Sequence, residues 1–149
     1  MAETLGSLCD KLTVVKLKQW HSDDPERQRS LKQQETQLQV EINEFITAAI
    51  TGEIPVDRLT FASNKVYKME GNVVGEVRGS IGNVFSQLAQ INCDLWHEQE
   101  KVYEFEQVQP EEKDSVVKRL ALLNLKRNQC IDQIDKQFRA AIEQALRRS

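Results

Sequence analysis

Charged side chains interrupt apolar rows in two of the helices that the sequence predicts. Steps of three and four residues from Ile91 give Leu95, then Glu98, then Val102, so Glu98 falls inside an otherwise apolar row. Arg127 interrupts an apolar row of the last predicted helix in the same way. Burying an unpaired charge is costly, so such groups must find partners. The simplest pairing joins Glu98 to Arg127, because a guanidinium can grip a carboxylate through two hydrogen bonds.

Further polar residues share these inward faces and predict a polar pocket between helices. We expect Arg127 to grip an anionic group, asparagines to orient the ligand, and His97 with Glu98 to transfer a proton. A nucleotide or a sugar phosphate fits such donors. The alternative is a Glu–Arg–Asn network that fixes the helix register without any ligand. The predicted catalytic residues are Asp10, His21, His97 and Glu98, and the predicted ligand-binding residues are Lys11, Asn92, Trp96, Asn124, Arg127 and Asn128.

Both tryptophans and both histidines of the chain occur as Trp-His pairs, at positions 20–21 and 96–97. A carboxylate follows each histidine by three residues, on the same helix face. Three interpretations stay open: the tryptophans anchor the bundle, the histidines act as acid and base, or they bind a transition metal. Di-iron bundles use Glu-x-x-His, the reverse of the order found here. The two carboxylates are Asp24 and Glu100.

Two pairs of acidic residues have the spacing that places both on one helix face. Glu41 with Glu44, and Asp132 with Asp135, are each three positions apart. Such pairs can hold Mg²⁺ against a phosphate, but we favour a solvated acidic face as their explanation. We therefore assign no metal ligands, leave the cofactor open, and do not favour a divalent metal.

Length and composition predict one soluble globular domain over residues 1–149. Hydrophobic residues make up 40% and charged residues 29% of the chain, as in ordinary folded proteins. The net charge is −3, with no basic face, so nucleic acid is disfavoured as a partner. No apolar run is long enough for a membrane span, and the first residues do not resemble a signal peptide. We expect a cytoplasmic protein.

The number and spacing of the cysteines are also those expected of a cytoplasmic protein. Cys9, Cys93 and Cys130 are odd in number and widely spaced, with no CxxC pair. This pattern argues against both a disulfide framework and a structural zinc site. We expect each to be a buried thiol.

The spacing of apolar residues, together with the prolines and glycines that begin or end helices, predicts an all-α fold. Helices are expected over about 4–22 and 25–51, followed by a less regular segment near 52–80. A third long helix should begin between 72 and 83, and a Gln-Pro-Glu-Glu sequence at 109–112 should separate it from a fourth that runs almost to the last residue. Long helices with short turns favour an antiparallel bundle of about four helices. Their spare apolar surface suggests a homodimer.

Three segments together resemble an uncharacterised helical family found in bacteria and some viruses. Residues 95–101 read Leu-Trp-His-Glu-Gln-Glu-Lys and are similar to a Leu-Trp-His-Glu-Glu-Asp-Lys signature. Residues 123–128 read Leu-Asn-Leu-Lys-Arg-Asn and resemble its Leu-Asn-x-x-Arg-Asn-Asp signature. Residues 6–12 are similar to the beginning of the family. The resemblance implies a helical fold and points to the same residues, but implies no reaction.

A second function hypothesis needs no small ligand. The long, highly charged helices are also typical of a non-enzymatic adaptor, for example a viral protein that acts through a protein partner. Whether the chain is an enzyme at all therefore stays open. A structure separates the two hypotheses, because the ligand hypothesis requires the polar residues to meet in one pocket deep enough for a small molecule.

Overall fold

The computed structural model describes residues 3–61 and 77–148, which form four α-helices and no strand. The predicted all-α fold is confirmed. The irregular segment predicted near 52–80 contains one short 3-10 helix, and its residues 62–76 lie outside the described part of the chain. The elements in chain order are α1 (Leu5–Trp20), α2 (Pro25–Thr51), η1 (Val56–Arg58), α3 (Ile81–Tyr103), η2 (Phe105–Gln107) and α4 (Pro110–Arg147).

Local chemistry sets the helix boundaries. Thr4 caps α1 through a capping box, in which its side chain accepts a hydrogen bond from the Ser7 backbone. Asp24 caps α2 and is followed by Pro25, whose missing N–H is not needed in a first turn. Gly52 ends α2 with a left-handed φ of 81°, which side chains disfavour. These ends agree closely with the sequence prediction.

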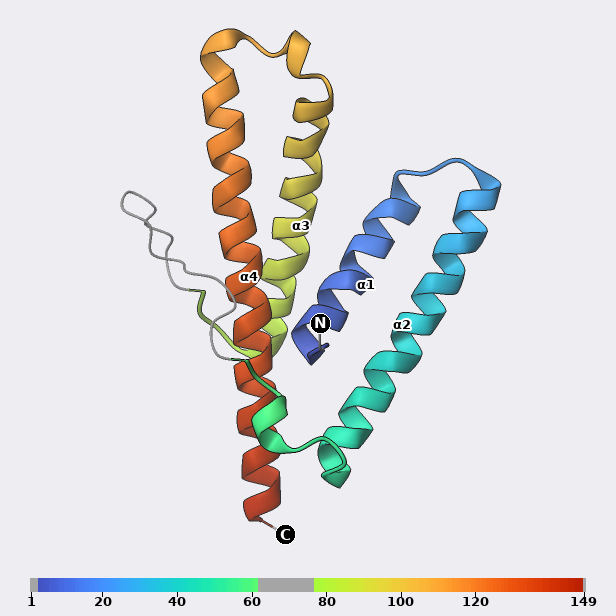
Figure 1. Cartoon of the computed structure of the whole chain (residues 1–149), viewed down its shortest axis with the longest axis vertical. Coiled ribbons are helices and arrows are strands. Elements are labelled where there is room, and N and C mark those ends of the chain that lie inside the picture. The colour runs from blue at the N-terminus through green and yellow to red at the C-terminus, as the bar shows by residue number, and fades with distance from the viewer. Residues whose placement is uncertain (1–2, 62–76, 149) are drawn as a thin grey trace.

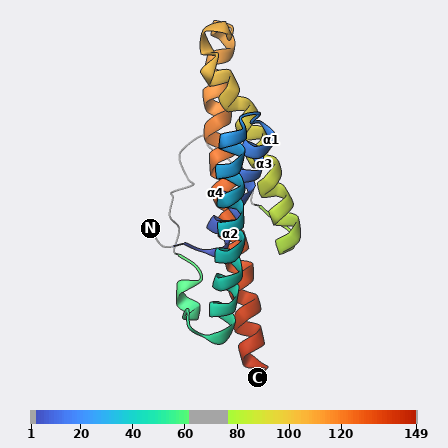
Figure 2. The ribbon, with the colours of Figure 1, turned by 90° about the vertical axis from the view of Figure 1, so that its right-hand side faces the viewer.

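The four helices form two antiparallel hairpins, and α1 joins them. α1 pairs with α2, α3 pairs with α4, and α1 packs against both α3 and α4 (Figure 1). α2 lies on the far side of α1 and is the foremost element when the molecule is turned by 90° (Figure 2). The attachment of the α1–α2 hairpin to the rest of the bundle therefore depends chiefly on α1.

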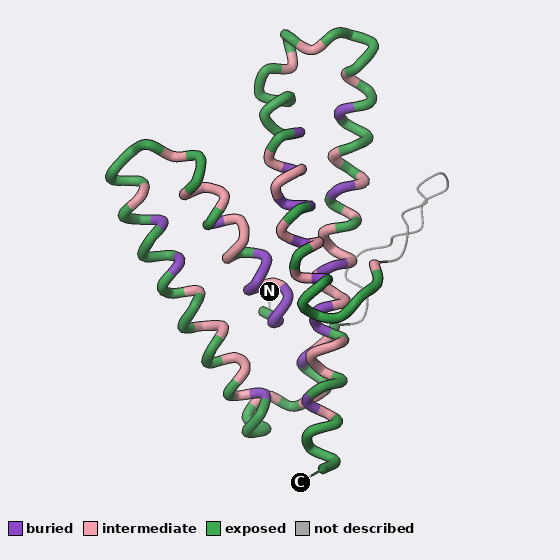
Figure 3. Tube along the Cα trace, turned by 180° about the vertical axis from the view of Figure 1, so that it is seen from behind, coloured by how far each residue is buried: buried purple, intermediate pink, exposed green. Residues whose placement is uncertain are grey.

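The main core lies where α1, α3 and α4 meet. Buried segments mark the facing sides of these helices, whereas α2 is mostly exposed (Figure 3). None of the described helices combines the length and the apolar character needed to cross a bilayer. The buried core residues are Leu5, Cys9, Val84, Leu88, Ile91, Leu95, Leu123, Cys130 and Ile134.

Two of the three cysteines are core residues, as expected. Cys9 and Cys130 are buried free thiols, and Cys93 is half-buried. Burial raises the pKa of the Cys9 and Cys130 thiols to about 11, so both stay protonated at neutral pH. They serve as small apolar side chains.

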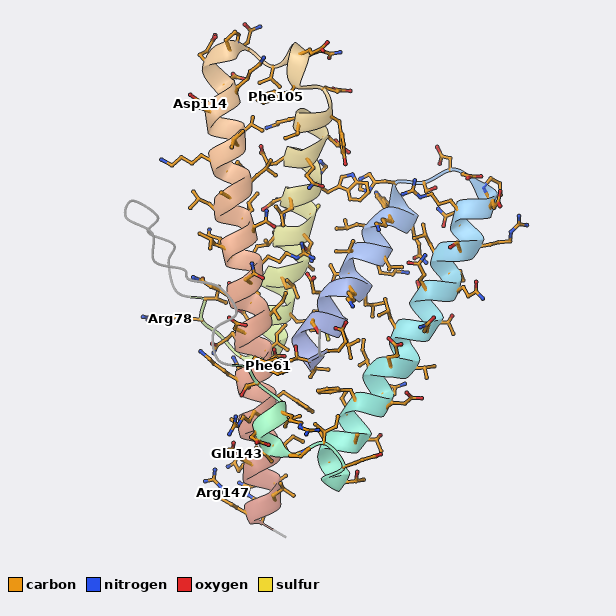
Figure 4. The ribbon with its side chains drawn as sticks, in the orientation of Figure 1. Phe61, Arg78, Phe105, Asp114, Glu143 and Arg147 are labelled. Atoms are coloured by element: carbon orange, nitrogen blue, oxygen red, sulfur yellow. The ribbon has the colours of Figure 1, made fainter. Side chains whose placement is uncertain are left out.

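The turn between α3 and α4 sets how these helices align. Phe105 lies in this turn, with the Lys113 ammonium 4.9 Å from the centre of its ring. Figure 4 shows Phe105 and Asp114 together at this end of the molecule. Because the hairpin is antiparallel, residues at equal distances along the chain from the turn lie opposite each other.

The beginning of α1 is fixed to α4 at close range. The Gly6 N–H donates to Asp135 Oδ1 over 2.7 Å. A Cβ on Gly6 would lie 2.5 Å from the backbone oxygen of Ile131 and 2.9 Å from Asp135 Oδ1. Only glycine therefore allows this approach.

Replacing this glycine should loosen α1. We predict that Gly6→Ala lowers the free energy of unfolding by about 1–3 kcal/mol, because backbone atoms must shift to admit the methyl group. Gly82 is the second residue of α3, as Gly6 is of α1, and a Cβ there meets no atom within 4 Å. Gly82→Ala is thus a matched control that should raise stability by about 0.5–1 kcal/mol. Urea unfolding measures both, and equal effects would contradict the close approach at Gly6.

Candidate functional site

Asp10 is the centre of the polar network inside the bundle. This residue is only 5% exposed, and its carboxylate accepts hydrogen bonds from two other helices. Arg127 Nε of α4 lies 2.8 Å from Asp10 Oδ1, and Arg127 Nη2 lies 2.5 Å from Oδ2. Asn92 Nδ2 of α3 donates to Oδ1 over 2.9 Å. The hydrogen bonds to Asp10 raise the pKa of Arg127, so the guanidinium stays charged beside the carboxylate.

The predicted pairing of Glu98 with Arg127 is wrong. Glu98 is buried as expected, but its Oε1 accepts hydrogen bonds from Arg119 Nε at 3.0 Å and Lys101 Nζ at 3.2 Å. The reason is the alignment of the α3–α4 hairpin. Glu98 and Arg119 lie at nearly equal distances from the turn, as do Asn92 and Arg127 farther along. Arg127 is therefore level with Asn92 and Asp10, and Glu98 lies nearer the turn.

Three of the predicted ligand-binding residues do not converge on this network. Asn124 is exposed, and its side chain donates to the Leu120 carbonyl of its own helix at 3.1 Å. Asn128 is half-buried and donates in the same way to the Asn124 carbonyl at 2.9 Å. Lys11 is exposed and pairs with Glu3. No ligand is needed to satisfy these groups.

The Trp-His pairs link the end of α1 to α3. His21 stacks on Trp96 with ring centres 4.6 Å apart and lies edge-on to His97 at 6.5 Å. The Trp96 indole N–H donates to Glu100 Oε1 over 2.9 Å. His97 is exposed while its neighbour Glu98 is buried, since adjacent helical residues point in different directions. The predicted proton-transfer couple of His97 and Glu98 is therefore not assembled.

Two further buried acids, Glu35 and Glu98, accept hydrogen bonds from lysine or arginine. Glu35 of α2 accepts from Lys16 at 2.8 Å and Lys32 at 3.0 Å, and these hydrogen bonds lower its pKa to about 2. Glu98 has the two cations described above, while its Oε2 is buried and accepts no hydrogen bond from the described residues. Asp10 differs from both, because Arg127 is its one cationic partner among the residues that the structure describes.

Asp135 is buried and has no cationic partner in the part of the chain that the structure describes. It receives the Gly6 N–H at the first turn of α1, where the helix dipole favours a negative group. Burial raises the pKa of its carboxyl to about 6, and the hydrogen bonds from Gly6 and Thr4 oppose this only in part. The acid pair Asp132 and Asp135 therefore does not form an exposed Mg²⁺ site. Within residues 3–61 and 77–148, no three His, Cys, Asp or Glu side chains are grouped to hold a metal.

A large groove opens between α1 and α2, and we call it the α1–α2 groove. Its volume is about 1350 Å³. Arg127 reaches its wall, as do three carboxylates of the α2 side, namely Glu41, Glu44 and Glu53. Lys11, Lys18 and Glu3 belong to the α1 side. The apolar side chains that line it include Leu8, Val14, Val15, Leu38, Phe45 and Ala48.

The sequence did not identify Arg119 as the partner of buried Glu98, or Asp135 as the acceptor of the Gly6 N–H. The position of the α3–α4 turn could have identified Arg119, because the turn sets which residues of α4 face Glu98. Asp135 gave no such signal, since its partner is a backbone N–H on α1. Comparisons of the chain with protein families, curated proteins and solved structures find no match. The resemblance to an uncharacterised helical family stays a prediction.

The Asp10–Arg127 pair should be more sensitive to loss of its cation than the other buried acids. We predict that Arg127→Met lowers the free energy of unfolding by about 3 kcal/mol, because Asp10 is then buried with only Asn92 as a donor. Lys16→Met is the matched control and should cost much less, since Glu35 keeps Lys32. Urea unfolding of both variants at neutral pH measures the difference. Equal losses of unfolding free energy in the two variants would contradict the prediction that Asp10 depends on its cation more than Glu35 does.

Asp135 should make stability depend on pH in the direction opposite to ordinary carboxylates. The pKa of its carboxyl is about 6 in the folded protein, against an ordinary value of 3.8, so the folded state holds the proton more tightly. The stability from this group is full below about pH 4 and is lost as pH rises through 6, by about 3 kcal/mol. We predict that Asp135→Asn removes this loss while the amide oxygen still accepts the Gly6 N–H.

Urea unfolding between pH 4 and pH 8 tests this prediction. The stability of Asp135→Asn relative to the natural protein should rise across that range. Asp114→Asn, which alters an exposed acid of α4, should give a curve parallel to that of the natural protein. Parallel curves for Asp135→Asn as well would show that Asp135 titrates normally.

Proposed function

We propose that this chain is a non-enzymatic helical interaction module, and that the α1–α2 groove is its binding surface. The observation that carries the proposal is the groove itself, about 1350 Å³ in volume and lined by apolar side chains of both helices. Such a groove between two helices fits the apolar face of a third helix, a common mode of peptide recognition. A surface for a helix needs no catalytic residues.

The contacts of the polar residues favour this function over the pocket for a small anion. Arg127 is held by Asp10 through two hydrogen bonds, so its charge is already balanced. The groove carries four carboxylates and three cations, a mixture that does not attract an anion. Its volume also exceeds the roughly 300–1,000 Å³ of typical small-molecule sites. A nucleotide or sugar phosphate stays the alternative prediction.

The charges along the groove define the chemistry of the helix that fits it. The Gln28 side chain donates to the Gln19 carbonyl over 2.7 Å, which places the end of α1, with Lys18, beside the beginning of α2. Glu44 and Glu53 lie toward the other end. A complementary helix therefore has apolar residues at three- and four-residue spacing, an acidic segment near Lys18 and a basic segment near Glu44.

Selection from a displayed library of amphipathic helical peptides tests this function. We predict that selected peptides have the charge order given above and bind the natural protein, as measured by fluorescence anisotropy. Thr47→Trp should weaken their binding by about tenfold or more, because the indole occupies the groove that exposed Thr47 lines.

The matched control places the same indole elsewhere on α2. Gln39 is exposed and does not line the groove, so Gln39→Trp should bind the selected peptides as the natural protein does. Failure to select any peptide would overturn the proposed function. Peptides that bind Thr47→Trp as well as Gln39→Trp would do the same, since they bind elsewhere.

A further inference from the structure

The face of α2 next to the groove has an ordered distribution of charge. Arg29 and Lys32 lie in the first half of the helix, and Glu41 and Glu44 lie in the second half, on one continuous surface. Val40 lies between them and is 48% exposed, which is high for an apolar side chain. Figure 2 shows α2 as the foremost helix, with none of the other described helices in front of it. We call this surface the outer face of α2.

The order of these charges makes the outer face complementary to itself. Arg29 and Glu44 lie at equal distances on either side of the point between Thr36 and Gln37, as do Lys32 and Glu41. An antiparallel copy of the helix, related by a twofold axis at that point, places Arg29 opposite Glu44, with Lys32 at the level of Glu41. A parallel copy would instead place like charges together.

Two of these charges have no partner among residues 3–61 and 77–148. Arg29 and Glu44 make no ion pair or hydrogen bond with any described residue, and both are exposed. Lys32 pairs with Glu35, and Glu41 accepts a hydrogen bond from Gln37. Arg29 and Glu44 are thus the pair whose charges are free to select a partner.

We propose that the helix that occupies the α1–α2 groove is α2 of a second copy of this chain, in antiparallel orientation. The inference rests on the proposed function, since it names the occupant of the same groove. The acidic half of the second copy's α2 then lies at the Lys18 end, beside Arg29 of the first copy. Its basic half lies at the end that carries Glu44 and Glu53. The charges of the groove and of the outer face therefore require the same orientation.

The apolar contact is reciprocal in this arrangement. Leu38 and Phe45 line the groove, and Val40 lies on the adjoining outer face. In this arrangement each α2 covers the apolar floor of the other copy's groove. The two α1–α2 hairpins then form a second antiparallel four-helix arrangement, with the α3–α4 hairpins outside it.

Exchange of the Arg29 and Glu44 charges tests the inference. The natural protein should be a dimer by size-exclusion chromatography with light scattering. Arg29→Glu should raise the dimer dissociation constant about tenfold or more, and so should Glu44→Arg, because each creates two like-charge contacts per dimer. An equal mixture of the two variants should restore the dimer, since every contact between them is again between opposite charges.

Two controls separate the alignment from a general effect of charge. Arg29→Glu combined with Glu44→Arg in one chain keeps the net charge and should dimerise again. Lys118→Glu changes the charge of an exposed position on α4 as much as Arg29→Glu does, and should leave the dimer intact. A circular-dichroism spectrum identical to that of the natural protein confirms that each variant is folded.

The outcomes distinguish this inference from the function on which it rests. A monomeric natural protein, or dimerisation that both single variants leave unchanged, overturns the antiparallel pairing. If selected peptides still bind the groove in that case, the proposed function stands with another helix as its partner. If instead the mixture restores the dimer while no peptide can be selected, the antiparallel pairing of α2 stands and the proposed recognition of other helices fails.

Discussion

The ion pair between Asp10 and Arg127 is the interaction on which the arrangement of the helices depends. α1 is the short helix that joins the α1–α2 hairpin to α3 and α4, and Asp10 lies in the middle of its buried face. One carboxylate receives donors from α3 and α4 together, so it fixes both the rotation of α1 and its position along the bundle. A purely apolar face would tolerate a shift by one turn, which would leave Asp10 without its partners.

The beginning of α1 adds a second constraint of the same kind. Gly6 approaches the backbone of α4 near Ile131 and donates its N–H to Asp135, two turns beyond Arg127. These two buried acids act differently. Asp10 is paired with the Arg127 cation, whereas burial makes the ionised form of Asp135 unfavourable near neutral pH. The attachment of α1 is therefore firm at Asp10 and sensitive to pH at its first turn.

The helices were predictable because the residues that begin and end each helix lie next to its boundary in the sequence. Caps at Thr4 and Asp24, the prolines that begin α2 and α4, and the glycine that ends α2 act within a few residues. The burial of Glu98 was predictable too, since it interrupts an apolar row, and Asp10 and Asn92 were among the polar residues expected to face inward. Their partners were not, because pairing depends on how one helix slides along another. Periodicity within a helix contains no information on that alignment, and only the turn between α3 and α4 constrains it.

The candidate site was harder to predict because a helix face is broad. Asn124 and Asn128 lie at the edge of the inward face, where an amide can bond to its own helix instead of reaching a neighbour. His97 and Glu98 are adjacent in sequence, and that alone directs their side chains to different sides. Sequence spacing could thus identify residues that are buried, but not residues that meet.

The use of charge inside the bundle explains why its function is sought on the surface of the α1–α2 hairpin. Asp10, Glu35 and Glu98 each form ion pairs with cations of the same chain, so their charges serve to hold the helices together. Fixing α1 in this way also holds one wall of the groove, which Leu8, Val14 and Val15 of α1 line. The groove is therefore a consequence of the interior network, and a helix that fills it can bind without disturbing any buried pair. Loss of Arg127 would instead release α1 and deform the groove, although Arg127 only touches its wall. Changes at Arg29 or Glu44 act on the surface alone, which separates recognition from folding in this chain.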